Sequence, residues 1–232
     1  MQPQTLTVIV PVYNERSTLR ASVERLLKAD LPLNLEVIVA DDGSTDGSAE
    51  TIADLVESSQ LRLVSHPINR GKGAAFKTGL ESATGDVVSV MDADLEYDPT
   101  DFEALLRPLR DGETEVSYGT RAWGAHTAYS FWFVLGNKVV TLVANVLYNT
   151  WLSDVETCFK MATRDAWHSL KLREDGFGIE AEATAKFLKR GYRIHELPIQ
   201  YRARTREEGK KLRWTAGLGA LWILLRVRLG AR

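Results

Sequence analysis

The sequence contains few of the residues that build disulfide frameworks and structural metal sites. Its 232 residues include one cysteine, Cys158, and four histidines. One cysteine cannot form an internal disulfide, and the histidines are scattered without the spacing of zinc ligands. We therefore expect a chain that folds in a reducing compartment, the cytosol. Its hydrophobic share of 44% is large enough to supply a buried core.

Long uninterrupted apolar runs are also lacking. The first residues, MQPQTLTVIVPVYNE, have neither the basic start nor the long apolar stretch of a signal peptide. Residues 131–152 are long enough to span a bilayer but include Lys138 and three asparagines, so we expect no free-standing span. Residues 214–225 are too short to cross. Basic residues flank them, so this stretch resembles an interfacial helix, with packing against the core or a partner as the alternative.

Charge is distributed unevenly along the chain, although the net charge is only −2. Residues 186–232 carry 13 Lys and Arg against 3 Glu, whereas residues 1–185 carry 16 basic and 28 acidic residues. Such a basic end is either a solvated helical surface or a surface that meets phosphates. No aromatic residues are interleaved with the basic ones as in nucleic-acid-binding motifs, so no nucleic-acid partner is expected.

Short apolar runs alternate with helical patterns in the first half of the chain, which predicts an α/β fold with a mostly parallel sheet flanked by helices. Strands are expected at 5–13, 35–43, 61–67, 86–94 and 115–121, and helices at 17–28, 48–58, 73–83 and 99–109. A further helix near 178–190 and a strand-like stretch at 192–202 follow. We expect residues 1–204 to form one domain and 205–232 to form a basic C-terminal segment with an amphipathic helix.

Three of the predicted strands end in polar side chains. Asn14 and Glu15 follow the first, Asp41 and Asp42 end the second, and Asp92-Ala93-Asp94 ends the fourth. Ligands of open α/β sheets bind at the carboxyl ends of the strands, so we expect the site there.

The Asp92-Ala93-Asp94 motif is typical of a metal site. Two carboxylates separated by a small residue can present oxygens to one hard cation, Mg²⁺ or Mn²⁺, and leave positions open for diphosphate oxygens. The cation would stabilise the charge that grows on a leaving group. Glu96, two residues further on, is a candidate third ligand, with an exposed loop acid as the alternative.

Two other motifs offer contacts to a nucleotide. Asp41 or Asp42 can accept hydrogen bonds from a base or ribose, although turn formation and helix capping explain the same residues. In Asn69-Arg-Gly-Lys-Gly-Ala-Ala, the glycines allow close approach of a phosphate, and Arg70 and Lys72 can neutralise a diphosphate. This segment is neither a P-loop nor a dinucleotide fingerprint.

Seven motifs in order resemble the inverting family-two glycosyltransferases of the GT-A fold, and within them the branch of dolichyl-phosphate mannose synthase and its polyprenyl-phosphate relatives. The resemblance runs from Val8 to about Trp214. The motifs are TVIVPVYNE, VIVADDGSTDGS, NRGKGAA, VVSVMDADLEYDP, SYGTR, DVETCFK and EEGKK. Many relatives have Gln where Glu96 stands, and Cys158 replaces a common glycine.

The resemblance implies roles for individual positions. The nucleotide-sugar positions are Pro11, Tyr13, Asn14, Glu15, Asp42, Arg70, Lys72, Asp92, Ala93, Asp94, Arg206 and Lys210; the metal positions are Asp92, Asp94 and Glu96; Arg121 and Lys138 are placed at an acceptor phosphate; and Asp94, Arg121 and Asp154 are the catalytic candidates. Arg206 and Lys210 lie in a segment that can fold over the diphosphate.

The resemblance implies transfer of a hexose, mannose from GDP-mannose or glucose from UDP-glucose, to a polyprenyl phosphate by a peripheral enzyme on the cytoplasmic face of a membrane. A phosphate acceptor is already ionised and needs no strong base. The alternative is a soluble transferase that acts on a hydroxyl, with Asp154 as base. A phosphohydrolase is disfavoured, because Glu96 stands where such enzymes have Thr or Val. A silent nucleotide-sugar-binding module remains a further alternative.

Overall fold

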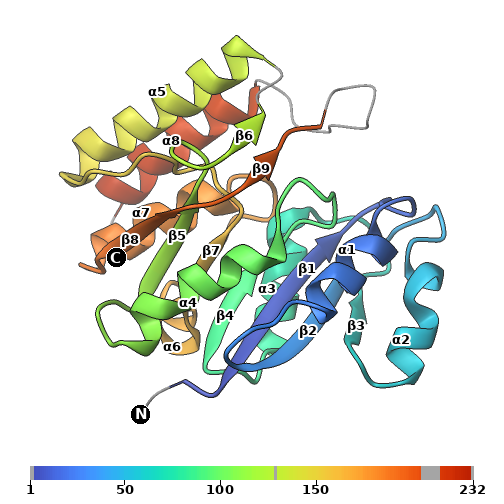
Figure 1. Ribbon diagram of the computed structural model, residues 1–232. Coiled ribbons are helices and arrows are strands. Elements are labelled where there is room, and N and C mark those ends of the chain that lie inside the picture. Colours follow the sequence, from blue (N-terminus) through green and yellow to red (C-terminus); the bar gives the residue numbers. More distant parts are fainter. Residues whose placement is uncertain (1–2, 128–129, 205–214, 231–232) are drawn as a thin grey trace.

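The computed structural model describes residues 3–127, 130–204 and 215–230 of the chain. Figure 1 shows one sheet with helices on both faces and a pair of helices, α5 and α8, beyond one end of it. In chain order the elements are β1 (Thr5–Val12), α1 (Leu19–Leu27), β2 (Asn34–Asp41), η1 (Ala49–Ile52), α2 (Ala53–Glu57), β3 (Arg62–Ser65), α3 (Lys72–Ser82), β4 (Val87–Val90), η2 (Pro99–Asp101), α4 (Phe102–Arg110), β5 (Val116–Thr120), β6 (His126–Thr127), α5 (Phe131–Tyr148), β7 (Lys160–Thr163), α6 (Arg164–Ser169), α7 (Ile179–Lys189), β8 (Ile194–Pro198), β9 (Tyr201–Arg202) and α8 (Thr215–Leu229).

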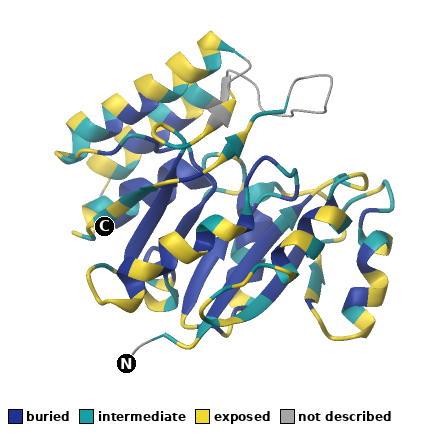
Figure 2. Cartoon of the chain, in the orientation of Figure 1, coloured by how far each residue is buried: buried dark blue, intermediate teal, exposed yellow. Residues whose placement is uncertain are grey.

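The main sheet has seven strands in the order β3-β2-β1-β4-β7-β5-β8, and all neighbours are parallel except β7, which runs antiparallel to both β4 and β5. The predicted α/β fold is therefore confirmed. Strands of a parallel sheet that is covered on both faces are buried on both sides, and every residue of β4 and β5 is buried (Figure 2).

Strand register brings the predicted site residues to one edge. Val12 of β1 pairs with Asp41 of β2, and Ile9 of β1 pairs with Val90 of β4. Because these strands are parallel, the segments that follow them leave the sheet on the same side. β4 ends at Val90, so Asp92-Ala93-Asp94 lies in the loop after the strand. The sequence had predicted that this motif forms the last residues of the strand.

The expected helix at 48–58 is divided in the structure. A short 3₁₀ turn, η1, precedes α2, and the backbone of Ile52 at the junction has φ −120° and ψ 10°, outside the helical region. Ile52 is fully buried against the sheet. Burial of this side chain takes precedence here over a continuous hydrogen-bond ladder.

The helices α5, α7 and α8 enclose a second, smaller apolar cluster. Its buried members include Val140 and Ala144 of α5, Ala181 of α7 and Leu224 of α8. The C-terminal helix thus packs against the rest of the chain, and it carries apolar side chains on its exposed side as well, such as Trp222. A domain boundary at residue 204 stays a prediction, because residues 205–214 lie outside the described part of the chain.

Close packing of α3 on β1 generates a stability prediction. A Cβ added at Gly79 would lie 2.5 Å from Ile9 Cγ2. We expect Gly79→Ala to lower the free energy of unfolding by about 1–3 kcal/mol through overpacking. Gly136 of α5 is the matched control, because a Cβ there meets nothing within 4 Å. Gly136→Ala should be neutral or stabilising by about 0.5–1 kcal/mol in urea denaturation. Equal effects of the two variants would contradict the packing.

Candidate active site

The loops after β1 and β2 are joined by side-chain hydrogen bonds. The amide of Asn14 donates to Ser44 Oγ at 2.9 Å, and Asn14 Oδ1 accepts from the amide of Thr45 at 2.8 Å. Asn14 has φ 53°, a left-handed conformation that asparagine tolerates. Its neighbour Tyr13 is 38% exposed. Pro11, another predicted nucleotide position, lies in β1 and is half-buried.

Asp42 is engaged by the protein itself. Its Oδ1 lies 2.7 Å from the His66 imidazole and accepts the amide of Arg70 at 2.9 Å, while Oδ2 accepts the amide of Gly71 at 2.6 Å. The carboxylate is buried and shapes the loop that precedes α3. The sequence predicted a direct contact of Asp42 with a nucleoside; the structure shows that its oxygens already hold this loop.

The glycines of the Asn69–Ala75 motif accommodate another part of the chain. Gly71 has φ 106°, and a Cβ at Gly71 or Gly73 would collide with the backbone carbonyls of residues 174–175. The amide of Ala74 also donates to the Asp175 carbonyl at 3.0 Å. The sequence predicts that these glycines allow the close approach of a phosphate. The backbone that approaches them is the segment before α7, and Arg70 is exposed beside it.

Lys72 lies between two carboxylates. Its Nζ is 2.7 Å from Asp92 Oδ1 and 2.7 Å from Glu180 Oε1. Burial opposes the charged form of this amine, but Asp92, Cys158 and Glu180 outweigh it and raise the pKa of Lys72 well above its usual value. The predicted diphosphate-binding lysine is thus paired with the first acid of the Asp92–Asp94 motif.

Asp94, the second acid of the motif, lies close to two other carboxylates. Burial, followed by the charges of Asp92 and Glu96, raises its pKa to about 7. Its Oδ1 accepts the amide of Glu96 at 3.0 Å, and Ala93, between the two acids, is buried. Within the described residues, no group of three or more His, Cys, Asp or Glu is arranged to hold a metal. The two aspartates offer hard oxygen ligands, so they fit a divalent cation whose other positions are filled by a ligand.

Glu96 is held by the segment around β9. Its carboxylate accepts hydrogen bonds from the Tyr201 hydroxyl and, at 2.8 Å, from the amide of Arg204. Its backbone carbonyl accepts the amide of Arg202. These contacts give Glu96 an anchoring role that the sequence did not predict, and they occupy the oxygens that we had assigned to a metal.

Arg204 is a second basic residue in the site, in addition to Lys72. Its guanidinium lies 3.3 Å from both Glu15 Oε2 and Asp94 Oδ2, and 3.8 Å from Glu96 Oε1. Arg206 and Lys210, the cations predicted from the sequence, lie outside the described residues. A signal was available, because Arg204 follows a strand-like stretch that ends at the same edge as the acids.

Arg121, after β5, forms the second half of the site. Its Nε and Nη2 lie 2.6 and 2.8 Å from the two oxygens of Asp154, and Asn137 Nδ2 donates to Asp154 Oδ1 at 2.9 Å. The guanidinium also lies 5.0 Å from the centre of the Tyr201 ring. Because Tyr201 contacts both Glu96 and Arg121, it joins the two halves. Lys138 is exposed on α5 and makes no ion pair or hydrogen bond with any residue described here.

Asp154 is a poor candidate for a general base. Burial would raise its pKa, but the charge and hydrogen bonds of Arg121, together with the Asn137 hydrogen bond, lower it below the usual value. A carboxylate with a lowered pKa and occupied oxygens binds a proton weakly. The structure therefore gives Asp154 the task of holding Arg121, which weakens the alternative in which it activates a hydroxyl.

This buried pair predicts a loss of stability in Asp154→Asn. The variant leaves Arg121 without its counter-ion, which we expect to cost about 3 kcal/mol of unfolding free energy at neutral pH. Since the folded pKa of Asp154 is lowered, its contribution is present above the usual carboxyl pKa of about 4 and is lost as the pH falls through the folded value. Urea denaturation from pH 3 to 7 should show the two proteins converging at low pH.

The matched control for this prediction is Asp54→Asn, which breaks an equally bidentate pair with Arg20 on the surface. Both side chains are largely exposed, so the cost should be much smaller. Similar losses for the two variants, or an Asp154→Asn effect that does not change with pH, would contradict the assignment.

Two curated proteins are similar to this chain in sequence. The chain is 29% identical over 208 residues to the low-salt glycan biosynthesis hexosyltransferase Agl6 of Haloferax volcanii, covering 88% of this chain and 49% of that protein. It is 27% identical over 209 residues to the dolichol-phosphate mannosyltransferase of Pyrococcus furiosus, covering 88% and 58%. The chain thus spans about half the length of these curated relatives.

Among solved structures, the fold resembles glucosyl-3-phosphoglycerate synthase from Mycobacterium tuberculosis, crystallised with Mn²⁺, UDP and phosphoglyceric acid. The TM-score is 0.73 at 22% identity, over 99% of this chain and 80% of that one. This likeness confirms the GT-A type of fold. Residues 7–170 match the family described as glycosyl transferase family 2. The chain belongs to glycosyl transferase family 2.

Proposed function

We propose that the chain is the catalytic part of a metal-dependent, inverting glycosyltransferase that moves a hexose from a nucleoside-diphosphate sugar to a polyprenyl phosphate. The observation that carries this proposal is the pairing of two half-sites through Tyr201: an acidic edge that suits a metal–diphosphate, and a buried arginine that suits a phosphate. Family membership and the hexosyl and mannosyl transfers named for the two relatives support it.

In the donor half, Asp92 and Asp94 would hold Mg²⁺ or Mn²⁺. That ion, when bound, supplies charge stabilisation to the departing nucleoside diphosphate. Tyr13 and Asn14 line the loop that would receive the nucleoside, and Asp42 keeps the neighbouring loop in shape. We propose that the cations for the diphosphate are Arg70 and, from the basic C-terminal segment, Arg206 and Lys210. GDP-mannose and UDP-glucose are the proposed donors.

In the acceptor half, Arg121 would bind the phosphate of the polyprenyl chain. A phosphomonoester is largely ionised near neutral pH, so one of its oxygens can attack the anomeric carbon without a strong base. Asp154, the acid that contacts Arg121, is committed to that arginine, which fits a phosphate acceptor better than a hydroxyl. Catalysis then depends on in-line placement and on charge stabilisation of the leaving group. Lys138 remains a proposed second contact from α5.

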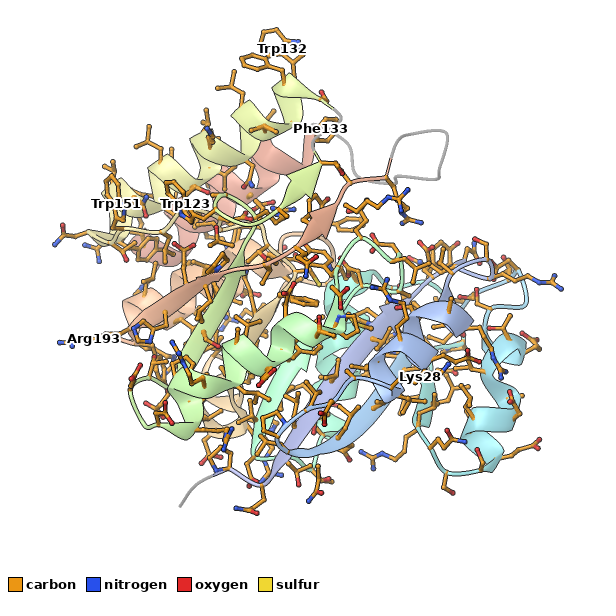
Figure 3. All side chains as sticks on the ribbon, viewed as in Figure 1. Lys28, Trp123, Trp132, Phe133, Trp151 and Arg193 are labelled. Carbon is orange, nitrogen blue, oxygen red and sulfur yellow. The ribbon has the colours of Figure 1, made fainter. Side chains whose placement is uncertain are left out.

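A membrane surface is the proposed location of the acceptor. Exposed apolar residues occur along α5 and α8, which we call the apolar helix face: Phe131, Trp132, Leu142, Val146, Leu218, Trp222 and Leu229. Figure 3 shows Trp123, Trp132 and Trp151 on this side of the molecule, far from the β1–β3 end. Exposed tryptophans and leucines over a large area are typical of membrane-associated surfaces.

One helix in the described part of the chain, α5, is long and apolar enough to cross a bilayer by length and composition, and 17% of its window is buried. Its other stripe packs on α7 and α8 through Val140 and Ala144. A helix with one side packed on protein and the other exposed fits an orientation along the membrane surface. We propose peripheral association with the cytoplasmic face, aided by the basic residues of the C-terminal segment.

The donor half predicts that Asp94→Asn lowers kcat by about 100-fold or more, because the ligand that binds the metal charge is lost. Transfer of radiolabelled mannose or glucose to polyprenyl phosphate is the measurement, with Mg²⁺, Mn²⁺ or EDTA present. EDTA should abolish transfer by the wild type, and circular dichroism should show that the variant is folded. Undiminished transfer by a metal-free enzyme would contradict the proposal, as would transfer to simple alcohols alone.

The apolar helix face predicts weaker membrane binding in Trp132→Glu/Leu142→Glu. Charged residues on an inserted face are costly, so co-sedimentation with anionic phospholipid vesicles should fall by at least about tenfold. Ile68→Glu is the control, because Ile68 is 68% exposed but lies in the loop before α3. Equal pelleting of both variants and the wild type would contradict the assignment of this face.

A further inference from the structure

Glu180 is a buried carboxylate that neither the sequence motifs nor the proposed chemistry uses. It lies in the first turn of α7, with 10% of its side chain exposed. Its Oε1 is 2.7 Å from Lys72 Nζ, and the same nitrogen is 2.7 Å from Asp92 Oδ1. A continuous chain of charges therefore runs from α7 through α3 to the acidic edge of the sheet.

Glu180 is held mainly by Lys72. Its second oxygen, Oε2, is buried and has no hydrogen-bond partner among the described residues. It borders a cavity of about 20 Å³ that Lys72, Lys160 and Phe76 also line. Such a cavity has room for one water molecule. Among the described residues, Lys72 is the ion-pair partner of this carboxylate.

The neighbouring lysine does not neutralise Glu180 by contact. Lys160 is fully buried and donates its ammonium to the carbonyls of Val155 and Thr157, at 2.8 and 2.7 Å. The N-terminus of α7 is also fixed in place, because a Cβ at Gly178 would collide with Ile223 of α8. Glu180 is thus presented to Lys72 by a helix whose N-terminus packs closely against α8.

The charge of Glu180 affects how much of the negative charge of Asp92 is available to a cation. Glu180, Lys72 and Asp92 together carry a net charge of −1. If Glu180 were neutral, Lys72 would pair with Asp92 alone, and the Asp92–Lys72 pair would carry no net charge, so Asp92 would attract a cation less strongly. Residues that orient a metal ligand from behind typically change metal affinity by about 10- to 100-fold.

We propose that Glu180 is a positioning residue for Asp92. By sharing Lys72 with Asp92, it leaves Asp92 Oδ2 and part of the carboxylate charge available to a divalent cation. This inference rests on the donor half of the proposed function and does not depend on the acceptor or on the membrane.

Manganese binding measured by electron paramagnetic resonance tests the inference without turnover. Free Mn²⁺ is titrated in the presence of GDP or UDP with the whole chain. Glu180→Gln keeps the shape of the side chain but removes its charge, and we expect the Kd for Mn²⁺ to rise by about 10-fold or more. Glu182→Gln is the matched control on the same helix, because Glu182 is buried but pairs with Lys186 and caps residues 173–174. It should lower thermal stability and leave the Kd unchanged.

The double variant Lys72→Met/Glu180→Gln separates positioning from a general loss of negative charge. Removing Lys72 frees Asp92 and restores a net charge of −1, so the double variant should bind Mn²⁺ more tightly than Glu180→Gln alone. This rescue supports the inference and also excludes misfolding of the single variant. The inference is overturned if Glu180→Gln binds Mn²⁺ as the wild type does, or if the double variant binds no better than the single one. Failure to transfer sugar to polyprenyl phosphate would refute the proposed function while leaving these binding results intact.

Discussion

Concentration of negative charge at one edge of the sheet is the constraint on which the site depends. Asp92, Asp94 and Glu96 follow a single strand, and Glu15 approaches from β1. Buried like charges repel, so the fold must bring cations to them. Lys72 arrives from the start of α3 and Arg204 from beyond β9, more than a hundred residues apart in sequence. The topology of the sheet is what places both at one point.

Helices outside the sheet support both halves of this site. α7 reaches Asp92 through Glu180 and Lys72, whereas α5 reaches Arg121 through Asn137 and Asp154. The same two helices enclose the second apolar cluster with α8. The layer formed by α5, α7 and α8 carries the apolar helix face. Ion pairs and hydrogen bonds therefore connect this layer to the residues proposed to bind donor and acceptor. This arrangement gives a structural reason for an enzyme to use a membrane-bound acceptor: the surface that would meet lipid and the residue that would meet phosphate belong to one packed unit.

The sequence predicted the fold and the edge of the sheet where the polar residues gather, because hydrophobic periodicity and strand-terminal acids are local signals. It also predicted Arg121 and Asp154 as candidate catalytic residues. It did not predict that they pair, that Asp42 holds the loop before α3, or that Gly71 admits residues 174–175. These features depend on contacts between segments that are remote in sequence. Glu180 gave no signal at all, since a glutamate in the first turn of a helix is common and only its partner makes it informative.

The central claim is that Asp92 and Asp94 bind a divalent cation together with a nucleoside diphosphate. Anomalous diffraction from crystals grown with Mn²⁺ and GDP or UDP measures this directly. We predict a single strong manganese peak at coordination distance from both carboxylates and from the diphosphate oxygens. A nucleotide bound at the sheet edge without manganese at these aspartates, or manganese bound elsewhere, would contradict the account.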